Sequence, residues 1–260
     1  MRLHSMTNNI PLALELYSLR DDLPKDVPGV LADVARIGYQ AVEFAGFHGY
    51  SAKDLKEILD DLGLKCAGTH TSLDSVSDDN IQQTAEFMAT LGSPFLIVPG
   101  VGREYQGTRD GAMRLAEKLS QAAKTAAEFG ARVGYHNHMW EFEPLPGGTF
   151  AMELLATNTP PEVVLQVDSG NLQEAGIDAI DFMETWNKRL GTVHLKPYVK
   201  DRDAEFSRYF IGEDDSDWSA ILGAINPANT EFVIVEQELY PNDLTPLECV
   251  KRCYDNLQKI

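Results

Sequence analysis

The sequence predicts a single α/β domain, a (β/α)8 TIM barrel, from three observations. Eight short apolar segments alternate with eight segments of helical periodicity along 260 residues. The segment PFLIVPG at 94–100 is continuously apolar, as expected of a parallel strand that is buried on both faces. No linker rich in Pro, Ser or Gly divides the chain. We therefore expect one domain over residues 1–260, in which residues 1–10 form a frayed N-terminal extension.

The expected strands and helices follow one another in strict alternation. Helix ends carry recognisable signals, such as Gly38 after the first helix and Ser51 with Asp54 at the start of the second. A polar stretch at 196–217 precedes the seventh helix. The expected strands are 12–19, 41–45, 64–70, 94–100, 132–138, 163–168, 190–195 and 231–237, and the expected helices are 26–37, 51–64, 78–91, 109–129, 150–157, 178–186, 218–225 and 245–257.

A doubly wound open sheet is the structural alternative for such an alternation. No expected strand is followed by a GxGxxG or GxxxxGK turn, which are the phosphate-binding signatures of that class. Polar residues also close strands along the whole chain, which favours the barrel because its active sites take residues from many strand ends.

Composition narrows the functional class. The formal net charge is −18, from 40 acidic and 22 basic residues, and such a surface repels nucleic-acid phosphates. No apolar run approaches the roughly 18 residues of a membrane span, so neither nucleic acid nor membrane is an expected partner. The N-terminus lacks the apolar core of a signal peptide. The three cysteines, an odd count without metal-type spacing, fit a reducing compartment, and we expect a cytoplasmic protein.

Histidines gather at the strand ends. His48, His70, His136, His138 and His194 all lie at or just beyond an expected strand end. In a barrel, the carboxyl ends of the strands meet on one face, where the chemistry takes place. Three strand ends carry polar residues two positions apart, which in a strand point to the same side: His136 with His138, His194 with Lys196, and Glu236 with Glu238.

Four polar residues on consecutive strands predict a metal site. Strands five to eight would place His136, Asp168, His194 and Glu236 around one point. Each alone has a plainer interpretation, since a strand-end carboxylate often caps the next helix and a histidine often makes a hydrogen bond in the core. Together, at matching heights, these imidazole and carboxylate groups suit a divalent transition ion, Mg or Mn.

The chain resembles the xylose-isomerase-like TIM-barrel superfamily of sugar phosphate isomerases and epimerases, which also contains inosose dehydratase and the endonuclease IV group. The resemblance runs nearly end to end. It is specific to the superfamily and not to one reaction. It rests on the motifs LELYSLR (14–20), VEFAGF (42–47), YHNHMWEF (135–142), VDSGN (167–171), VHLKP (193–197), IGEDDSDW (211–218) and VEQE (235–238).

The resemblance implies a divalent-metal site whose ligands are Glu, Asp, His and Glu from strands five to eight. Asp168, His194 and Glu236 match this pattern residue by residue. His136 stands where the epimerases carry the first glutamate, so the chain lacks one of the two glutamates of a symmetric epimerisation. The form YHNHxxEF is closer to the inosose-dehydratase-like branch. The endonucleases use more ligands and a basic groove, which a net charge of −18 does not fit.

The implied activity is a metal-dependent sugar isomerase or epimerase that removes an α-proton and stabilises an enediolate with Mn, Mg, Co or Zn. Glu236 or His138 would be the general base. Lys196 would hold the oxyanion or a ligand carboxylate, and Glu141 would act as a second acid or base or orient a histidine. The sugar or keto-sugar pocket would be lined by Glu43, His70, Trp140 and Glu238.

Three alternatives stay open. The same enediolate serves an inosose-dehydratase-like enzyme or a 3-keto-glycoside lyase. A hydroxypyruvate-isomerase-like enzyme would need a basic anchor for its substrate, for which Lys196 and Arg20 are the candidates. A metal-free sugar-binding barrel would keep the pocket without the ligand geometry. Whether the chain forms a homo-oligomer is also left open.

Overall fold

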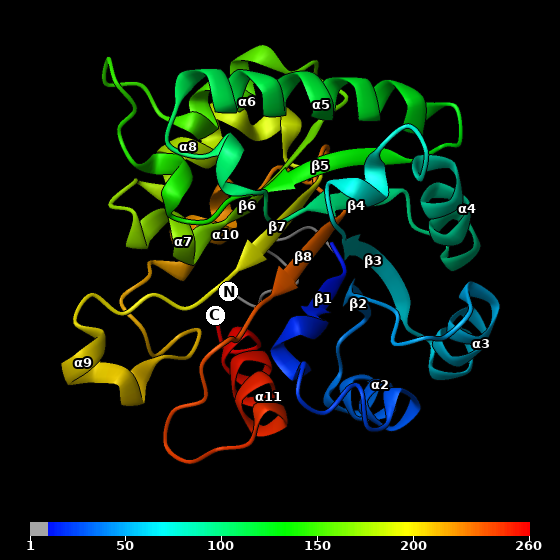
Figure 1. Cartoon of the computed structure of the whole chain (residues 1–260). Coiled ribbons are helices and arrows are strands. Elements are labelled where there is room, and N and C mark those ends of the chain that lie inside the picture. The colour runs from blue at the N-terminus through cyan, green and yellow to red at the C-terminus, as the bar shows by residue number, and fades with distance from the viewer. Residues whose placement is uncertain (1–9) are drawn as a thin grey trace.

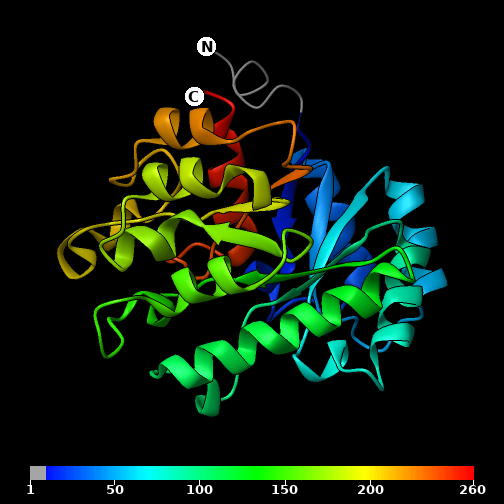
Figure 2. The ribbon, with the colours of Figure 1, turned by 90° about the horizontal axis from the view of Figure 1, so that it is seen from above.

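The computed structural model describes residues 10–260 and contains a closed barrel of eight parallel strands. The strands follow chain order around the barrel, and β1 pairs with β8 to close it. Figure 1 shows the strands at the centre with the helices outside them, and Figure 2 shows the same arrangement turned by 90°. The predicted TIM barrel is confirmed. Most of the extension expected at 1–10 lies outside the described residues.

The strands are short, and helices on the outside follow them. The strands are β1 Leu12–Glu15, β2 Ala41–Ala45, β3 Lys65–His70, β4 Phe95–Val98, β5 Arg132–His136, β6 Val164–Asp168, β7 Thr192–Leu195 and β8 Phe232–Val235. The α-helices are α2 Val27–Ile37, α3 Ala52–Leu62, α4 Ile81–Leu91, α5 Arg109–Ala127, α6 Ala151–Asn158, α7 Ser169–Glu174, α8 Ala179–Trp186, α9 Arg202–Glu205, α10 Trp218–Ala224 and α11 Pro246–Leu257.

The expected helix signals are present. Ser51 caps α3 by accepting a hydrogen bond from the backbone N–H of Asp54. Gly38 ends α2 with a φ of 119°, a left-handed conformation that glycine adopts without strain. These local signals fix where the chain turns back toward the next strand.

Three segments differ from the expectation. The segment expected as a strand over 12–19 is a strand only to Glu15, whose carboxylate caps the 3-10 helix η1, Leu16–Leu19, by accepting from the N–H of Tyr17. The short helix α7 follows β6 directly, because Asp168 accepts a hydrogen bond from the N–H of Asn171. The polar stretch 196–217 contains the four-residue helix α9.

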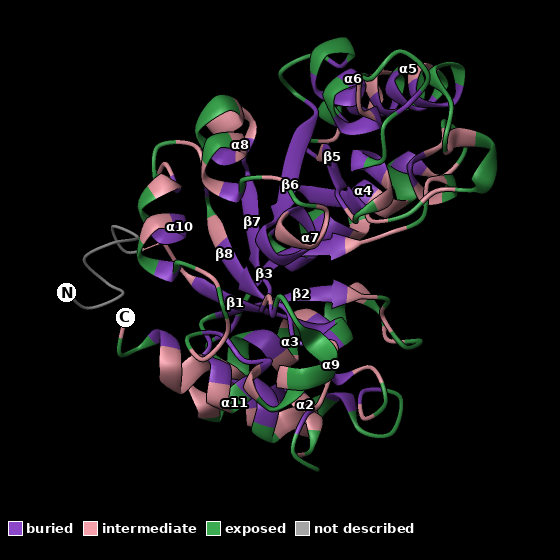
Figure 3. Ribbon diagram, turned by 90° about the vertical axis from the view of Figure 1, so that its left-hand side faces the viewer, coloured by how far each residue is buried: buried purple, intermediate pink, exposed green. Residues whose placement is uncertain are grey.

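Apolar side chains fill two places, one between strands and helices and one inside the barrel. The outer core is continuous around the barrel, and Figure 3 shows the strands almost wholly buried while the helices expose their outer faces. Two small groups of buried apolar residues come from the strands themselves and pack apart from the outer core: Ala13, Ala41, Ala67 and Ile234 in one group, and Phe95, Ile97 and Val164 in another. Several inward side chains nearer the carboxyl ends, among them Gln166, Asp168 and His194, are polar. None of the helices within residues 10–260 combines the length and apolar character that crossing a bilayer requires.

Candidate functional site

The strand register brings the polar strand ends side by side. Asp168 on β6 pairs with His194 on β7, and His136 on β5 pairs with Gln166 on β6. Because inward positions alternate along a strand, Gln166 and Asp168 both face the barrel interior. The polar side chains therefore follow one another along the barrel interior toward the carboxyl ends of the strands.

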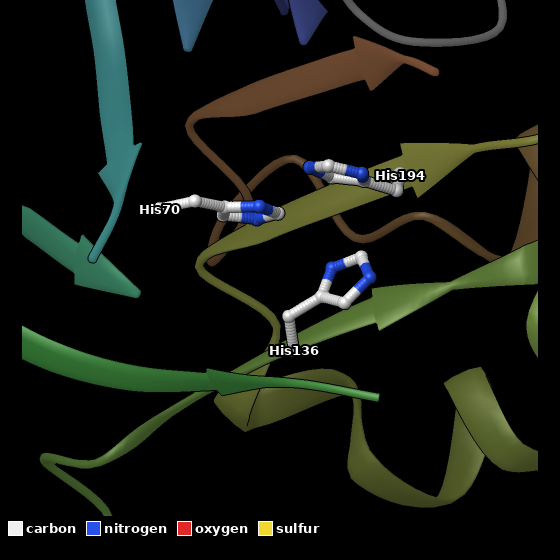
Figure 4. A group of neighbouring side chains, drawn as sticks. All are labelled: His70, His136 and His194. Atoms are coloured by element: carbon white, nitrogen blue, oxygen red, sulfur yellow. The ribbon is translucent and has the colours of Figure 1, made fainter. Parts of the chain in front are cut away.

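The four expected metal ligands come together. One ligand atom from each of His136, Asp168, His194 and Glu236 lies within 4.8 Å of the others, and all four residues are buried. Figure 4 shows the imidazoles of His136 and His194 gathered with that of His70, each reaching in from a different strand. The centroids of the His136 and His194 rings are 4.7 Å apart. This cluster could hold a metal ion.

The protonation of His136 fits a metal ligand. The amide nitrogen of Gln166 donates to Glu43, at 2.9 Å from Oε1, so its oxygen faces the histidines. That oxygen lies 2.9 Å from His136 Nδ1. Because an amide oxygen can only accept, Nδ1 carries the proton and Nε2 keeps its lone pair. The hydrogen bond from Nδ1 to Gln166 thus leaves Nε2 free to bind a metal ion, an arrangement that is common for metal-binding histidines.

Asp168 supplies an oxygen suited to the same ion. Its Oδ1 caps α7 through the N–H of Asn171 at 2.7 Å. Its Oδ2 is buried without a hydrogen-bond partner among the described residues, and it lies 3.9 Å from His136 Nε2. An unprotonated imidazole nitrogen and a carboxylate oxygen at this separation suit a cation between them. Burial raises the pKa of Asp168 to about 7, because nothing adjacent fully compensates its charge.

His194 lies between two carboxylates. Its Nδ1 is 2.8 Å from Glu236 Oε2, and its Nε2 is 2.6 Å from Glu43 Oε2. Burial alone would lower the pKa of His194, but the hydrogen bonds to Glu236 and Glu43 raise it well above its usual value. Gly68 on β3 leaves room for Glu43, since a Cβ there would lie 2.8 Å from Oε1. Metal binding through Nδ1 would release a proton from His194 and leave Nε2–H donating to Glu43.

Lys196 places a buried cation beside the cluster. Its Nζ lies 2.5 Å from Glu238 and 4.0 Å from both Asp168 and Glu236. Burial alone would raise the pKa of Glu236, but Lys196 and His194 outweigh it and hold that pKa well below its usual value. Glu236 is therefore ionised at neutral pH.

A cavity of about 530 Å³ opens onto the cluster. Burial, followed by the nearby Lys196 charge, lowers the pKa of His138 to about 4, so this imidazole is neutral at pH 7. The polar side chains that line the cavity come from several strand ends and loops: Tyr17, His70, Thr71, Ser72, His136, His138, Glu236 and Glu238.

Of the residues expected to line the pocket, Glu43 and Trp140 do not line this cavity, and neither do the expected catalytic residues Lys196 and Glu141. Glu141 is fully buried and accepts hydrogen bonds from the Tyr135 hydroxyl at 2.8 Å and from the His138 N–H at 2.9 Å. Trp140 is half-buried and packs against an apolar cluster that contains Leu145. Neither lines the cavity. Glu141 instead fixes the backbone that carries His138.

Two buried residues of this region were not singled out from the sequence. Gln166 contacts His70, His136, Glu43 and Thr192. Glu15, at the end of β1, is fully buried and pairs in register with Glu43. The available signal was a polar residue inside an otherwise apolar strand, in VVLQVD and LALELYSL.

Comparisons with known proteins agree with this architecture. The family model described as xylose isomerase-like TIM barrel matches residues 31–253. An inosose dehydratase of Clostridium perfringens is 24% identical over 253 residues, covering 84% of each chain. A sugar phosphate isomerase/epimerase from Parabacteroides distasonis has a TM-score of 0.83 and 25% identity, covering 96% of this chain and 98% of that one.

A further structure shares the fold and carries a metal. The IOLI protein, solved with a binding zinc atom, has a TM-score of 0.67 and 17% identity, covering 95% of this chain and 96% of its own. At that identity the likeness concerns the fold. The family model, in contrast, spans most of the chain. This chain belongs to the xylose isomerase-like TIM barrel family.

Proposed function

We propose that this chain is a divalent-metal-dependent enzyme that removes the proton α to the carbonyl of a neutral keto-sugar or inositol-derived ketone. The observation that carries the proposal is the buried set of His136, Asp168, His194 and Glu236, which meets a cavity of about 530 Å³. A divalent ion held by that set would act as a Lewis acid for the charge that develops on the carbonyl oxygen.

The side chains supply the proton transfer. Glu236 both belongs to the ligand set and lines the cavity, and its low pKa keeps it ionised as a base. His138 lines the same cavity and is neutral, so it is the second group able to accept a proton. The ammonium group of Lys196 lies 4.0 Å from Glu236 and 2.5 Å from Glu238, and its charge attracts both carboxylates. The site thus has a base next to the four residues that would hold the metal ion.

The placement of the carboxylates favours elimination over epimerisation. The carboxylates that line the cavity are Glu236 and Glu238, which both follow β8. An epimerisation that uses two carboxylates needs them on opposite faces of the substrate, and β5 presents His136 instead. We therefore propose that loss of the α-proton is followed by departure of a β-hydroxyl or glycosyl group, with isomerisation as the second candidate. The relatives named inosose dehydratase support this choice.

The charge of the cavity favours a neutral substrate. Within residues 10–260, no lysine or arginine lines it. Lys196 is engaged by Glu238. Arg20 donates to the Tyr240 hydroxyl at 2.8 Å and to the Glu238 carbonyl at 3.1 Å. A carboxylate or phosphate would enter the cavity without a free lysine or arginine to bind it, so we propose that hydroxypyruvate-like and phosphorylated substrates are excluded.

The test combines metal reconstitution with solvent-isotope exchange. The protein would be stripped with a chelator, reloaded separately with Mn, Co, Zn or Mg, and incubated in D2O with an inosose, a 3-keto-glycoside and free ketoses. We expect metal-dependent deuterium incorporation and, from a substrate with a β-leaving group, an unsaturated product seen by mass spectrometry.

Each other outcome has a clear meaning. Exchange without loss of a substituent would identify an isomerase or epimerase. Sugar binding without exchange, unchanged by metal removal, would identify a sugar-binding barrel and refute the proposed chemistry.

A further inference from the structure

A second group of buried side chains lies beside the first. The ligand atoms of Glu15, Glu43, His70 and His194 fall within 4.8 Å of one another. Glu15 and Glu43 are fully buried, and His70 reaches the cavity from the end of β3. The two groups share His194, whose two ring nitrogens face Glu236 in one and Glu43 in the other.

Glu15 has an unpartnered oxygen, as Asp168 does. Its Oε1 accepts from the N–H of Tyr17 at 3.0 Å, while its Oε2 is buried with no hydrogen-bond partner among residues 10–260. Glu15 Oε2 and Asp168 Oδ2 are the two side-chain oxygens of the described chain in this condition. Each belongs to one of the two groups. An unpaired carboxylate oxygen in a buried site is costly unless a proton or a cation meets it.

His70 resembles His136 in that a hydrogen bond to Gln166 leaves its other ring nitrogen free. His70 Nε2 lies 2.7 Å from Gln166 Oε1, the same oxygen that accepts from His136. Nε2 therefore carries the proton, and Nδ1 of the neutral ring keeps its lone pair. That Nδ1 is 4.0 Å from Glu15 Oε2. At this distance a proton on Glu15 cannot form a hydrogen bond to Nδ1, which needs about 3 Å, whereas a metal ion about 2.1 Å from each atom fits.

The charge of the region points the same way. Five carboxylates gather at this end of the barrel, and each needs a proton, a cation or a hydrogen-bond donor to be buried there. Lys196 lies near the Asp168 side of the region, and the Glu15 side has no such ion pair with a lysine or arginine among the described residues. The carboxylates concerned are Glu15, Glu43, Asp168, Glu236 and Glu238.

We propose that Glu15, Glu43 and His70 bind a second divalent cation next to the first. Two carboxylates and one imidazole suit Zn, Co or Mn. His194 would ligate the first ion through Nδ1 and, through Nε2–H, orient the Glu43 ligand of the second. His70 opens the second site to the cavity, so the ion has a path from solvent. The proposal concerns ion binding and does not require the proposed reaction.

Counting bound ions tests the proposal. The protein would be stripped, reloaded with Co(II), separated from free metal by gel filtration, and analysed for cobalt per chain. We expect two ions in the natural protein and one in Glu15→Gln, in which the amide still accepts from the Tyr17 N–H. Asp168→Asn should also retain one ion, and the double variant none. The matched control is Glu141→Gln, a buried carboxylate of neither group, which should keep two.

One ion per chain in the natural protein, or two ions in Glu15→Gln, would overturn the proposal, since either result means that a proton or water satisfies Glu15. If Glu15→Gln fails to fold, anomalous diffraction from cobalt-loaded crystals of the natural protein decides the question. A second peak bounded by Glu15, Glu43 and His70 supports the site, and a single peak removes it. Because no step measures turnover, failure here leaves the proposed reaction standing.

Discussion

The β5–β8 half of the site and the β1–β3 half contain the same types of group in different surroundings. Each has an unprotonated imidazole nitrogen facing an unpartnered carboxylate oxygen, at 3.9 Å for His136 and Asp168 and at 4.0 Å for His70 and Glu15. Only the β5–β8 half adds a buried lysine, Lys196, and a base on the cavity wall, Glu236. Ligand geometry is thus common to both halves, while acid–base chemistry is concentrated in one.

Removing the shared or catalytic ligand should have the largest effect. His194→Ala and Glu236→Gln should each abolish turnover, by roughly a thousandfold or more, and greatly weaken binding of the first ion. His194→Ala should also disturb the second half, because it deprives Glu43 of its 2.6 Å partner. Turnover and metal content measured on the same samples check this. Full activity in either variant would disprove the proposed site.

His138 separates chemistry from metal binding within the β5–β8 half. It lines the cavity but belongs to neither ligand group. We expect His138→Gln to retain its bound metal and lose about 100-fold or more in kcat, the usual contribution of a positioned acid or base. Metal loss in this variant would mean that His138, and not His136, ligates the ion.

Gln166 contacts residues of both halves, so its loss should moderately weaken metal binding in both. Its oxygen accepts from both His70 and His136, and its nitrogen donates to Glu43. Gln166→Leu removes the acceptor that selects both tautomers. We expect each metal affinity to fall about 10- to 100-fold, as for other residues that orient metal ligands, when competition with a fluorescent chelator is measured.

An exchange of side chains provides the control for Gln166. Glu43→Gln combined with Gln166→Glu keeps these residues hydrogen-bonded, because the amide at 43 can donate to the carboxylate at 166 and still accept from His194, while the Thr192 hydroxyl turns to donate to that carboxylate. The exchange should restore affinity for the first ion relative to Gln166→Glu alone. If the single and double variants are equally weak, Gln166 acts through packing and not through proton placement.

The sequence was sufficient to predict the fold and to predict that the four strand-end residues of the β5–β8 half lie together. Alternating strands and helices are local patterns, and strands that are consecutive in a barrel are neighbours, so Asp168 and His194 could be placed together before their register was known. The i, i+2 spacing also placed Glu236 and Glu238 at the same cavity, as the structure has them.

The β1–β3 half could not be predicted in the same way. Glu15 contacts His70 across the barrel interior, and such a contact depends on barrel closure and strand tilt rather than on spacing. Gln166 has no charge to attract notice, although it joins several strands. Glu141 lies outside the cavity for a different reason: it is part of the 3-10 helix η4, Trp140–Phe142, which turns it toward Tyr135.

Glu141 therefore offers the smallest and most selective test, because it is a buried carboxylate outside both halves. Burial raises its pKa from the usual 4.5 to about 7. The folded state thus binds a proton that the unfolded state releases, and this contribution to stability is present below about pH 4.5 and lost as the pH rises through about 7. The loss amounts to about 3 kcal/mol.

Glu141→Gln should remove this pH dependence and leave both ions bound. The amide can accept from the His138 N–H while donating to the Tyr135 hydroxyl, so both hydrogen bonds survive. Urea unfolding at several values between pH 5 and pH 8 checks the prediction. We expect the variant to gain stability relative to the natural protein as the pH rises, with turnover little changed. Parallel pH profiles would show that Glu141 ionises normally. A large loss of turnover with metal retained would return Glu141 to the catalytic residues, because it would then act through the position of His138.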